Sequence, residues 1–322
     1  MKNFLIILLL GLFLLSTILF LVTQPVFFAK LDPQKNHAVQ VSRLKRDVDF
    51  LSLQLFPRNA EHPDALDRMA DYIQDEFKKA GLAPTEQIYQ VSGISYKNIV
   101  ASYGPKDKAL VIVGAHYDVC EDQPGADDNA SGVAGLLEIA RLLGGLRPTL
   151  DYRVELVAYT LEEPPYFKTQ QMGSFFHAKT LHDSGTEVKA MLSLEMIGYF
   201  SEQKNSQSFP LGFLKWIYPS TGNFIATVGR FQEMGLARRV KKAMKTASSI
   251  PVFSLNAPAF IPGVNFSDQL SYWHFGYPAV MITDTAFYRN PHYHRASDTP
   301  ATLDFDRMAE VVKGIYQAVT SL

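Results

Sequence analysis

The sequence has 322 residues, of which 47% are hydrophobic, 20% charged and 12% aromatic, a balance typical of a globular protein with a large core. Its net charge at pH 7 is -1 and it has no basic block, which excludes a nucleic-acid-binding domain and leaves no nucleic acid among the expected partners. The single cysteine, Cys120, excludes an intramolecular disulfide and a cysteine-rich zinc site.

The N-terminal segment predicts a membrane anchor. Residues 4–23 carry no charge, are predominantly apolar, and match the ~20 residues that cross a bilayer as a helix. A cleavable signal peptide has a shorter apolar core and a small-x-small cleavage site, whereas here only Ala29 is small and Phe27 stands two residues before it. We therefore expect an uncleaved anchor and connector over residues 1–29. We expect a single domain over 30–322, extracytoplasmic, in the periplasm or the extracellular space.

Strand and helix patterns alternate along the rest of the chain. Strands are predicted at 87–93, 95–104, 111–115, 151–160, 188–200, 222–229 and 277–285. Helices are predicted at 41–52, 65–80, 131–143, 172–185, 231–247, 267–276 and 303–322. The stretch 201–219 lacks periodicity and 252–267 is interpreted as a loop, so we expect 200–266 to hold a lid or rim insertion. This alternation predicts an α/β fold with a mostly parallel mixed central sheet and helices on both faces.

Polar side chains gather where successive predicted strands end. These clusters are His116 with Asp118, Asp127 with Asp128, Glu162 with Glu163, Glu195 alone, and His292 with His294 and Asp298. Active sites of open α/β sheets lie outside the carboxyl ends of the strands. Histidine and carboxylate ligands without cysteine suit zinc in an open, catalytic site. One histidine for each of two metals, a bridging aspartate and two further carboxylates would make a two-metal hydrolase site.

Each cluster has a structural interpretation when it is taken alone. The Asp-Asp-Asn run is able to cap the helix that follows it, and paired glutamates are commonly a solvated turn. Successive side chains on extended backbone point opposite ways, so one of Glu162 and Glu163 can bind metal while the other acts as a general base. Glu195 lies in an apolar strand, where a lone carboxylate is costly unless it is paired or bound to metal. The shared strand ends favour one common site.

Several segments, in order from about residue 98 to the C-terminus, carry a more specific resemblance. They are GAHYDV with GADDNASG, AYTLEEPP, LSLEMIGY, SDQLSYWHFGYPAVMITDT and YHRASDTPATLDF. Together they resemble the co-catalytic di-zinc exopeptidases, metallopeptidase family twenty-eight. This family includes secreted leucyl aminopeptidases, glutamate carboxypeptidase II and the glutaminyl cyclases. The resemblance implies the zinc-exopeptidase, phosphorylase/hydrolase-like fold.

The resemblance also implies a site for two Zn²⁺ ions. The implied metal ligands are His116, Asp128, Glu163, Glu195 and His294. Asp128 bridges the two ions, and Glu195 joins His116 at the first. Glu163 joins His294 at the second.

Further roles follow from the same resemblance. Glu162 matches the general base of the family, and Asp118 matches the carboxylate that orients His116. The peptide bond after Asp128 is implied to be cis.

The sequence departs from the family pattern at two positions. Glu195 stands where the best-known peptidases have Asp, and Gln269 stands where many relatives have His. We expect Gln269 and Tyr293 on the substrate rim, where Gln269 would affect substrate choice rather than metal binding. Cys120 lies four residues after His116, and we interpret it as a small buried hydrophobe without a role in the site.

The predicted function is that of a metallo-aminopeptidase, a hydrolase acting on peptides with a free N-terminus. Glu162 would take a proton from the attacking water, which zinc activates. The alternatives are a glutaminyl-cyclase-like transferase with one zinc, and an inactive membrane-anchored binding domain. Apart from peptide substrates, the expected partner is a membrane, contacted through residues 4–23.

Overall fold

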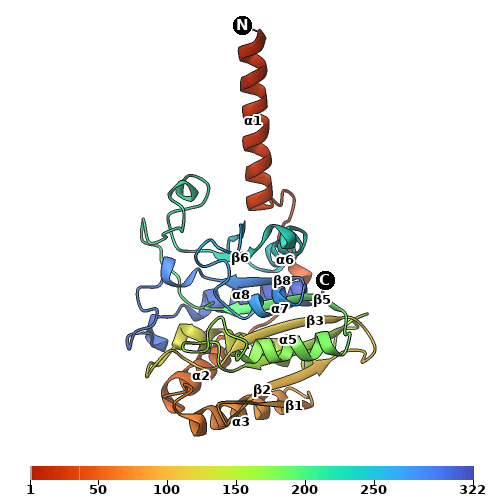
Figure 1. Cartoon of the computed structure of the whole chain (residues 1–322), viewed down its shortest axis with the longest axis vertical. Helices are drawn as coiled ribbons and strands as arrows, with labels where there is room; N and C mark the ends of the chain where they lie inside the picture. The colour runs from red at the N-terminus through yellow and green to blue at the C-terminus, as the bar shows by residue number, and fades with distance from the viewer. Residues whose placement is uncertain (1, 36) are drawn as a thin grey trace.

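The computed structural model describes residues 2–35 and 37–322, and it shows a long N-terminal helix standing on a layered α/β domain (Figure 1). One eight-stranded sheet runs through the domain in the order β1-β2-β4-β3-β5-β8-β6-β7. The strands are β1 Pro84–Val91, β2 Ile94–Tyr103, β3 Leu110–His116, β4 Arg153–Tyr159, β5 Val188–Glu195, β6 Ile225–Gly229, β7 Val252–Asn256 and β8 Ala279–Thr283.

The centre of the sheet is parallel. Strand β3 pairs in parallel with β4 and β5, β5 pairs in parallel with β8, and β6 with β7. Strands β1 and β2 form an antiparallel hairpin that joins β4 antiparallel, and β6 joins β8 antiparallel. Every residue of β3 is buried, which explains the unbroken apolar sequence that precedes His116 at its end. The predicted mixed sheet is confirmed, and the carboxyl ends of β3, β4, β5 and β8 meet at one edge.

Helices cover both faces of the sheet, as predicted. On one face the helices α2 (Val41–Asp49), α3 (Pro63–Lys79), α4 (Gly132–Leu146), α6 (Met234–Ala247) and α8 (Phe305–Val319) contribute to the larger hydrophobic core. On the other face α5 (Gly173–Asp183) and α7 (Gln269–His274) pack over a second core (Figure 1). Each predicted helix is thus present, with its ends shifted by a few residues.

Two sequence predictions about strands need correction. Residues 252–267 were expected to be a loop, but they begin with strand β7, in which Val252, Ser254 and Asn256 are buried and the alternate residues are half-buried. Polar side chains at two of the three buried positions concealed the strand pattern. The strand predicted over 188–200 ends at Glu195, because Met196 adopts a left-handed backbone conformation with φ 49°.

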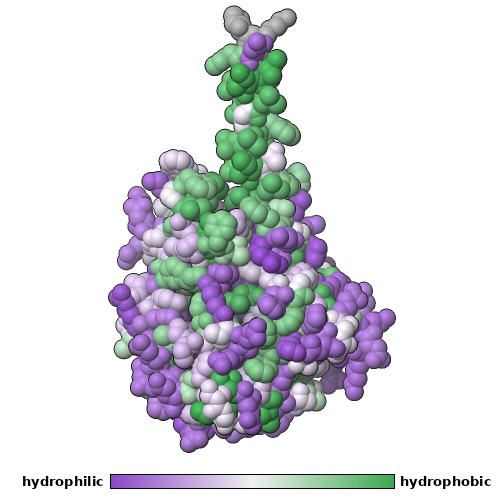
Figure 2. All heavy atoms as spheres, viewed as in Figure 1, coloured by the Kyte–Doolittle hydropathy of each residue, from purple (hydrophilic) through white to green (hydrophobic). Residues whose placement is uncertain are grey.

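Helix α1 (Lys2–Thr23) projects away from the domain (Figures 1 and 2). Its segment Asn3–Thr23 has a mean hydropathy of 3.1, and none of it is buried against the domain. It is therefore long and apolar enough to cross a membrane. The helix is joined to the domain at its base. The carbonyl of Thr23 accepts hydrogen bonds from Lys241 Nζ (2.7 Å) on α6 and from Ser254 Oγ (2.6 Å) on β7. The edge strand β7 is therefore the strand nearest to α1.

Candidate metal centre

The predicted metal ligands converge at the carboxyl edge of the sheet. His116 is the last residue of β3, and Glu195 is the last residue of β5. Glu162 and Glu163 follow the end of β4, and His294 comes from the loop after β8. The parallel pairing of β3 with β4 and β5 thus brings side chains from distant parts of the sequence to one point.

Asp128 lies between the two histidines. Its Oδ1 is 3.4 Å from His116 Nε2, and its Oδ2 is 3.2 Å from His294 Nε2. On the far side of His116 Nε2, Glu195 Oε2 lies 3.3 Å away. On the side of His294, Glu163 Oε2 lies 3.3 Å from Nε2. The structure therefore brings the five predicted ligands into two adjoining groups that share Asp128.

Unpartnered buried atoms indicate that these residues fit metal ions. Within the described residues, His116 Nε2, His294 Nε2 and Glu163 Oε1 are buried without a hydrogen-bond partner. Buried polar atoms are normally paired, so unpaired ones that face each other are typical of a cation site. Potential ligand atoms of His116, Asp128 and Glu163 all lie within 4.8 Å of one another. Imidazole and carboxylate donors are common ligands of catalytic zinc.

The backbone around Asp128 is fixed by a second carboxylate. Asp298 accepts hydrogen bonds from the backbone N–H of Asp127 (3.0 Å) and of Asp128 (3.0 Å). The peptide bond Asp128–Asn129 is cis, as the resemblance implied. Gly125 begins this turn with φ 56°, and a Cβ there would lie 2.2 Å from the carbonyl oxygen of Asp128. Only glycine fits this position without moving the Asp128 backbone.

A buried arginine that sequence analysis did not single out supports the metal-site loop, which we define as residues 117–131 between β3 and α4. Arg58 has only 1% of its surface exposed. Its guanidinium donates hydrogen bonds to the carbonyls of Tyr117 (3.0 Å), Gly125 (2.6 Å) and Leu51 (3.3 Å), and to that of Pro124. Burial lowers its pKa to about 10, so it stays cationic at neutral pH. Arg58 therefore supports the loop as a charged cross-link.

Asp118 contacts more than its predicted partner. Its Oδ1 lies 3.6 Å from His116 Nδ1, and the nearer acceptor for that nitrogen is the Asp118 carbonyl at 3.2 Å. The carboxylate accepts hydrogen bonds from the backbone N–H groups of Glu162 (3.2 Å) and Glu163 (3.0 Å). Asp118 thus links the loop after β3 to the glutamate pair after β4.

The site concentrates buried carboxyl groups. Burial raises the pKa of Glu162 well above its ordinary value and raises that of Asp268 to about 7. Burial acts in the same direction on Asp128, but hydrogen bonds with His116 and His294 outweigh it and lower the pKa of Asp128. Carboxylates crowded in this way favour bound cations or protons.

The two residues expected on the substrate rim differ in their surroundings. Gln269 is fully buried, and its Nε2 donates a hydrogen bond to the carbonyl of Val264 at 3.0 Å. Gln269 is therefore covered by other residues, and its contact with substrate stays a prediction. Tyr293 stacks on the ring of His294, with the ring centroids 3.8 Å apart.

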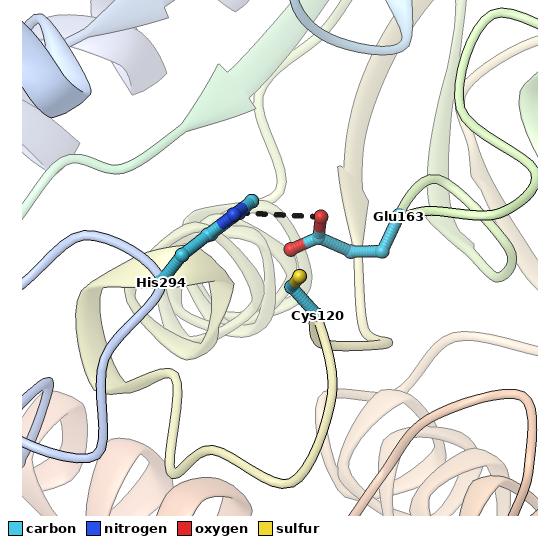
Figure 3. Close-up of side chains that lie close together, drawn as sticks. All are labelled: Cys120, Glu163 and His294. Carbon is cyan, nitrogen blue, oxygen red and sulfur yellow. Dashed lines mark ion pairs between the residues drawn. The ribbon is translucent and has the colours of Figure 1, made fainter.

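The interpretation of Cys120 as a buried hydrophobe is wrong. Cys120 is half-buried, and its sulfur faces Glu163 and His294 (Figure 3). Asp268 is another residue that sequence analysis did not place in the site: it is fully buried, and neither carboxyl oxygen has a hydrogen-bond partner in the described chain. The available sequence signals were that Cys120 lies four residues after His116 and that Asp268 directly precedes Gln269.

An apolar pocket extends from Glu195. The segment 207–218 forms one wall, and 253–266 forms another. Its lining includes the aromatic residues Phe209, Tyr218, Phe224, Phe253, Phe266 and Phe287. The pocket therefore offers apolar space beside the first metal group.

The chain is similar in sequence to a known protein family and to known proteins. Residues 98–319 match peptidase family M28. The chain is 48% identical over 281 residues to the uncharacterized protein YfbL of Escherichia coli, which covers 85% of both chains. It is 30% identical over 237 residues to a probable leucine aminopeptidase of Trichophyton verrucosum, covering 70% of this chain and 57% of that protein. The chain thus spans little more than half the length of that fungal relative.

Solved structures share the fold. The Legionella pneumophila aminopeptidase LapA superposes with a TM-score of 0.71 at 18% identity, over 92% of this chain and 76% of that chain. The zinc aminopeptidase BSAP of Bacillus subtilis gives 0.68 at 14% identity, over 88% and 94%. The glutaminyl cyclase of Fimbriiglobus ruber gives 0.66 at 18% identity, over 92% and 98%.

The family match covers more than half of the chain and spans every predicted metal ligand. The prediction of a metallo-aminopeptidase-type hydrolase is confirmed at the level of the family. From its motifs, its fold and its relatives, the chain belongs to peptidase family M28.

Proposed function

We propose that this chain is a zinc-dependent aminopeptidase with two Zn²⁺ ions per chain. The observation that carries the proposal is Asp128, which faces His116 with one oxygen and His294 with the other. His116 and Glu195 would hold the first ion, and Glu163 and His294 the second, with Asp128 bridging. When bound, such ions polarise the scissile carbonyl and lower the pKa of water.

Glu162 is the proposed general base. It is 5% exposed and lies 3.9 Å from His116 Nε2, near the metal groups. In this role Glu162 takes a proton from the attacking water and passes it to the leaving amine. Asp118 supports this role because it fixes the backbone N–H of Glu162.

The substrate is proposed to be a peptide with a free N-terminus and a large apolar first residue. The pocket beside Glu195 has an apolar, aromatic lining that would accept the first side chain. Nearby carboxyl groups, including the fully buried Asp268, favour a cationic α-amino group. Within 200–266, the segment 207–218 supplies one wall of this pocket and is the part that we propose as a rim, since β6, α6 and β7 belong to the sheet and its core.

A panel of matched peptides tests the activity. Leu-, Phe-, Gly- and Gln-initiated peptides are incubated with the zinc-loaded full chain in detergent, each with a free and with an acetylated N-terminus. We expect release of Leu and Phe from the free peptides alone, faster than release of Gly. Cleavage of acetylated peptides at the same rate would contradict the aminopeptidase proposal. Conversion of the Gln peptide to pyroglutamate without release of any residue would favour a cyclase.

We propose that α1 anchors the enzyme in a membrane. The domain of residues 30–322 would then lie outside the cytoplasm. The anchorage is supported by the exposed apolar span Asn3–Thr23. The full chain should stay in the membrane fraction after alkaline carbonate extraction. Protease added outside intact cells, after the outer membrane is opened where there is one, should degrade the domain. Solubility after extraction, or protection from the protease, would contradict this location.

A further inference from the structure

We propose that Cys120 is an additional ligand of the second metal ion, beside Glu163 and His294. This inference rests on the proposed metal site, and nothing in the sequence motifs assigns it. The ligand atoms of Cys120, Glu163 and His294 all lie within 4.8 Å of one another. Figure 3 shows the sulfur turned toward the Glu163 carboxylate, which is joined by an ion pair to the imidazole of His294. A modest contraction around one ion would bring all three into bonding distance.

An independent observation on Glu163 points to the same ligand site. Glu163 is only 5% exposed, yet its Oε1 has no hydrogen-bond partner within the described residues. The other oxygen, Oε2, is the one that lies 3.3 Å from His294 Nε2. The carboxylate group therefore reaches His294 with one oxygen while the second is left beside Cys120 (Figure 3). A cation between the carboxylate, the sulfur and the imidazole would satisfy this buried oxygen.

The loop geometry holds the thiol near this position. Cys120 follows Asp118, whose carboxylate is tied to the backbone of Glu162 and Glu163. One residue earlier, the N–H of Val119 donates a hydrogen bond to the carbonyl of Arg58 at 3.1 Å. Cys120 is therefore carried by a segment anchored on both the glutamate pair and the Arg58 cross-link.

The chemistry of a thiol ligand sets the expected properties. When the metal binds, the S–H bond breaks, its proton goes to solvent, and the thiolate donates an electron pair to the metal. Thiolate is a soft ligand that favours zinc over magnesium or manganese. We therefore expect Cys120 to raise the affinity and the selectivity of the second position for zinc.

Cobalt substitution tests the sulfur–metal bond directly. The apo full chain in detergent is loaded with Co²⁺, and bound cobalt is counted on the same sample. Because the chain has one cysteine, any thiolate-to-cobalt charge-transfer band in the near ultraviolet belongs to Cys120. We expect this band in the natural protein and its loss in Cys120→Ser, while the d–d bands from histidine and carboxylate coordination persist. Bound cobalt without the charge-transfer band in the natural protein would overturn the inference but not the proposed function.

Thiol reactivity and affinity provide a second readout. We expect zinc to protect Cys120 from alkylation in the natural protein. We expect Cys120→Ser to weaken binding of the second zinc by at least the roughly 10-fold that loss of an outer-shell partner costs. Equal alkylation rates with and without bound zinc would overturn the inference. Failure to bind any metal would overturn this inference and the proposed metal site together.

The end of the domain from which α1 leaves carries a basic surface. We infer that this end lies against anionic phospholipid headgroups once α1 has entered a bilayer. Arg238, Arg239 and Lys242 are exposed on α6 and line a groove with the connector residues Phe27 and Phe28. The guanidinium of Arg238 lies 5.7 Å from the ring centroid of Phe20, near the end of α1. These cations are therefore at the level where headgroups would surround the helix.

Exposed aromatic side chains lie at the same end. Trp216 is 81% exposed and Phe213 is 48% exposed, both in the short helical turn Gly212–Trp216. The segment of residues around this turn rises to the height of the last turn of α1 (Figure 1), and Figure 2 shows apolar residues around the base of that helix. Tryptophan is enriched at membrane–water interfaces. The exposed aromatic residues and the basic face of α6 thus suit one interfacial plane.

Fluorescence of the full chain in nanodiscs tests this surface. The chain has two tryptophans, and the other, Trp273, is only 7% exposed. In nanodiscs of brominated phosphatidylcholine, we expect quenching of Trp216 that increases when phosphatidylglycerol is added. Trp216→Phe should abolish this quenching, and the triple variant Arg238→Glu, Arg239→Glu, Lys242→Glu should abolish its dependence on phosphatidylglycerol.

The control is that each variant remains in the nanodisc, which separates insertion of α1 from contact of the domain. Quenching that is the same with and without phosphatidylglycerol in the natural protein would overturn the inference. So would unchanged lipid dependence in the triple variant.

Discussion

Glu162 and Glu163 are neighbours in the chain but face different parts of the site. Glu163 Oε2 lies 3.3 Å from His294 Nε2, whereas Glu162 Oε2 lies 3.9 Å from His116 Nε2. Both backbone N–H groups are held by the carboxylate of Asp118. The carboxylate of Asp118 therefore holds the backbone of both glutamates, to which the proposed mechanism gives different tasks.

These two glutamates make a matched pair of variants. We expect Glu162→Gln to keep its zinc and to lose roughly 10²–10⁴-fold in kcat, because it removes the proton acceptor and no ligand. We expect Glu163→Gln to lose the second zinc, because it removes a ligand. The measurement is zinc content and peptide turnover on the same samples. Full turnover in Glu162→Gln would show that another group is the base.

At the level of residues, sequence analysis identified the charged groups that stand at strand ends but missed those that act through the fold. His116, Glu195 and His294 were recognisable because their motifs are local. Arg58 was not, because its partners are backbone carbonyls up to 67 residues away, which leave no side-chain pattern. The closeness of Cys120 to His294 likewise depends on how the loop after β3 meets the loop after β8.

The metal-site loop between β3 and α4 is the element on which the site depends. It is held by Arg58 from one side and by Asp298 from the other. Neither Arg58 nor Asp298 is among the predicted metal ligands. The loop is therefore expected to keep its shape when the metal is removed.

Arg58→Lys tests this element. A single ammonium cannot reach the spread of carbonyls that the guanidinium contacts, so buried carbonyl groups lose their partners. We expect a clear fall in Tm and weaker zinc binding. The control is Arg68→Lys, at an exposed position on α3. Equal Tm and zinc affinity in the two variants would mean that Arg58 does not support the loop.

Gly125→Ala tests the same loop at its turn. The added Cβ would meet the Asp128 carbonyl at 2.2 Å, in a backbone conformation that disfavours side chains. We expect loss of bound zinc with a folded sheet, measured by metal content and circular dichroism. Gly185→Ala is the matched control, since Gly185 also has positive φ but open space around it. A zinc content equal to that of the control would contradict the steric argument.

The elements themselves followed from sequence to different degrees. The central strand β3 was predictable because all of its residues are buried and, apart from His116 at its end, none of them is polar. The edge strand β7 was not, because an edge strand pairs on one side only and here buries Ser254 and Asn256. Ser254 is buried where it contacts Lys241 on α6 and the carbonyl of Thr23, which is 231 residues away in the sequence.

At the scale of the whole molecule, the joint between α1 and the domain contains a buried cation. Lys241 is 5% exposed, and burial lowers its pKa to about 8 from the ordinary 10.5. Between these two values the unfolded chain binds more protons at this residue than the folded chain does. The contribution of Lys241 to the free energy of unfolding therefore rises with pH across this window.

Replacement of Lys241 by methionine tests this linkage. Urea unfolding of the full chain in neutral detergent is followed at pH 8 and pH 10. Between pH 8 and pH 10, we expect the free energy of unfolding of the natural protein to rise relative to that of Lys241→Met by on the order of 2 kcal/mol. Other titrating groups contribute equally to both proteins. Parallel pH dependence in the two proteins would mean that Lys241 is not perturbed.

The measurement that tests the central claim most directly is a zinc titration with activity followed on the same sample. The apo full chain receives zinc in known equivalents, and bound zinc and release of the first residue from a free Leu-initiated peptide are measured at each step. The proposed function predicts that activity rises to a plateau at two bound zinc ions per chain. A plateau at one ion, or two bound ions without release of leucine, would contradict it.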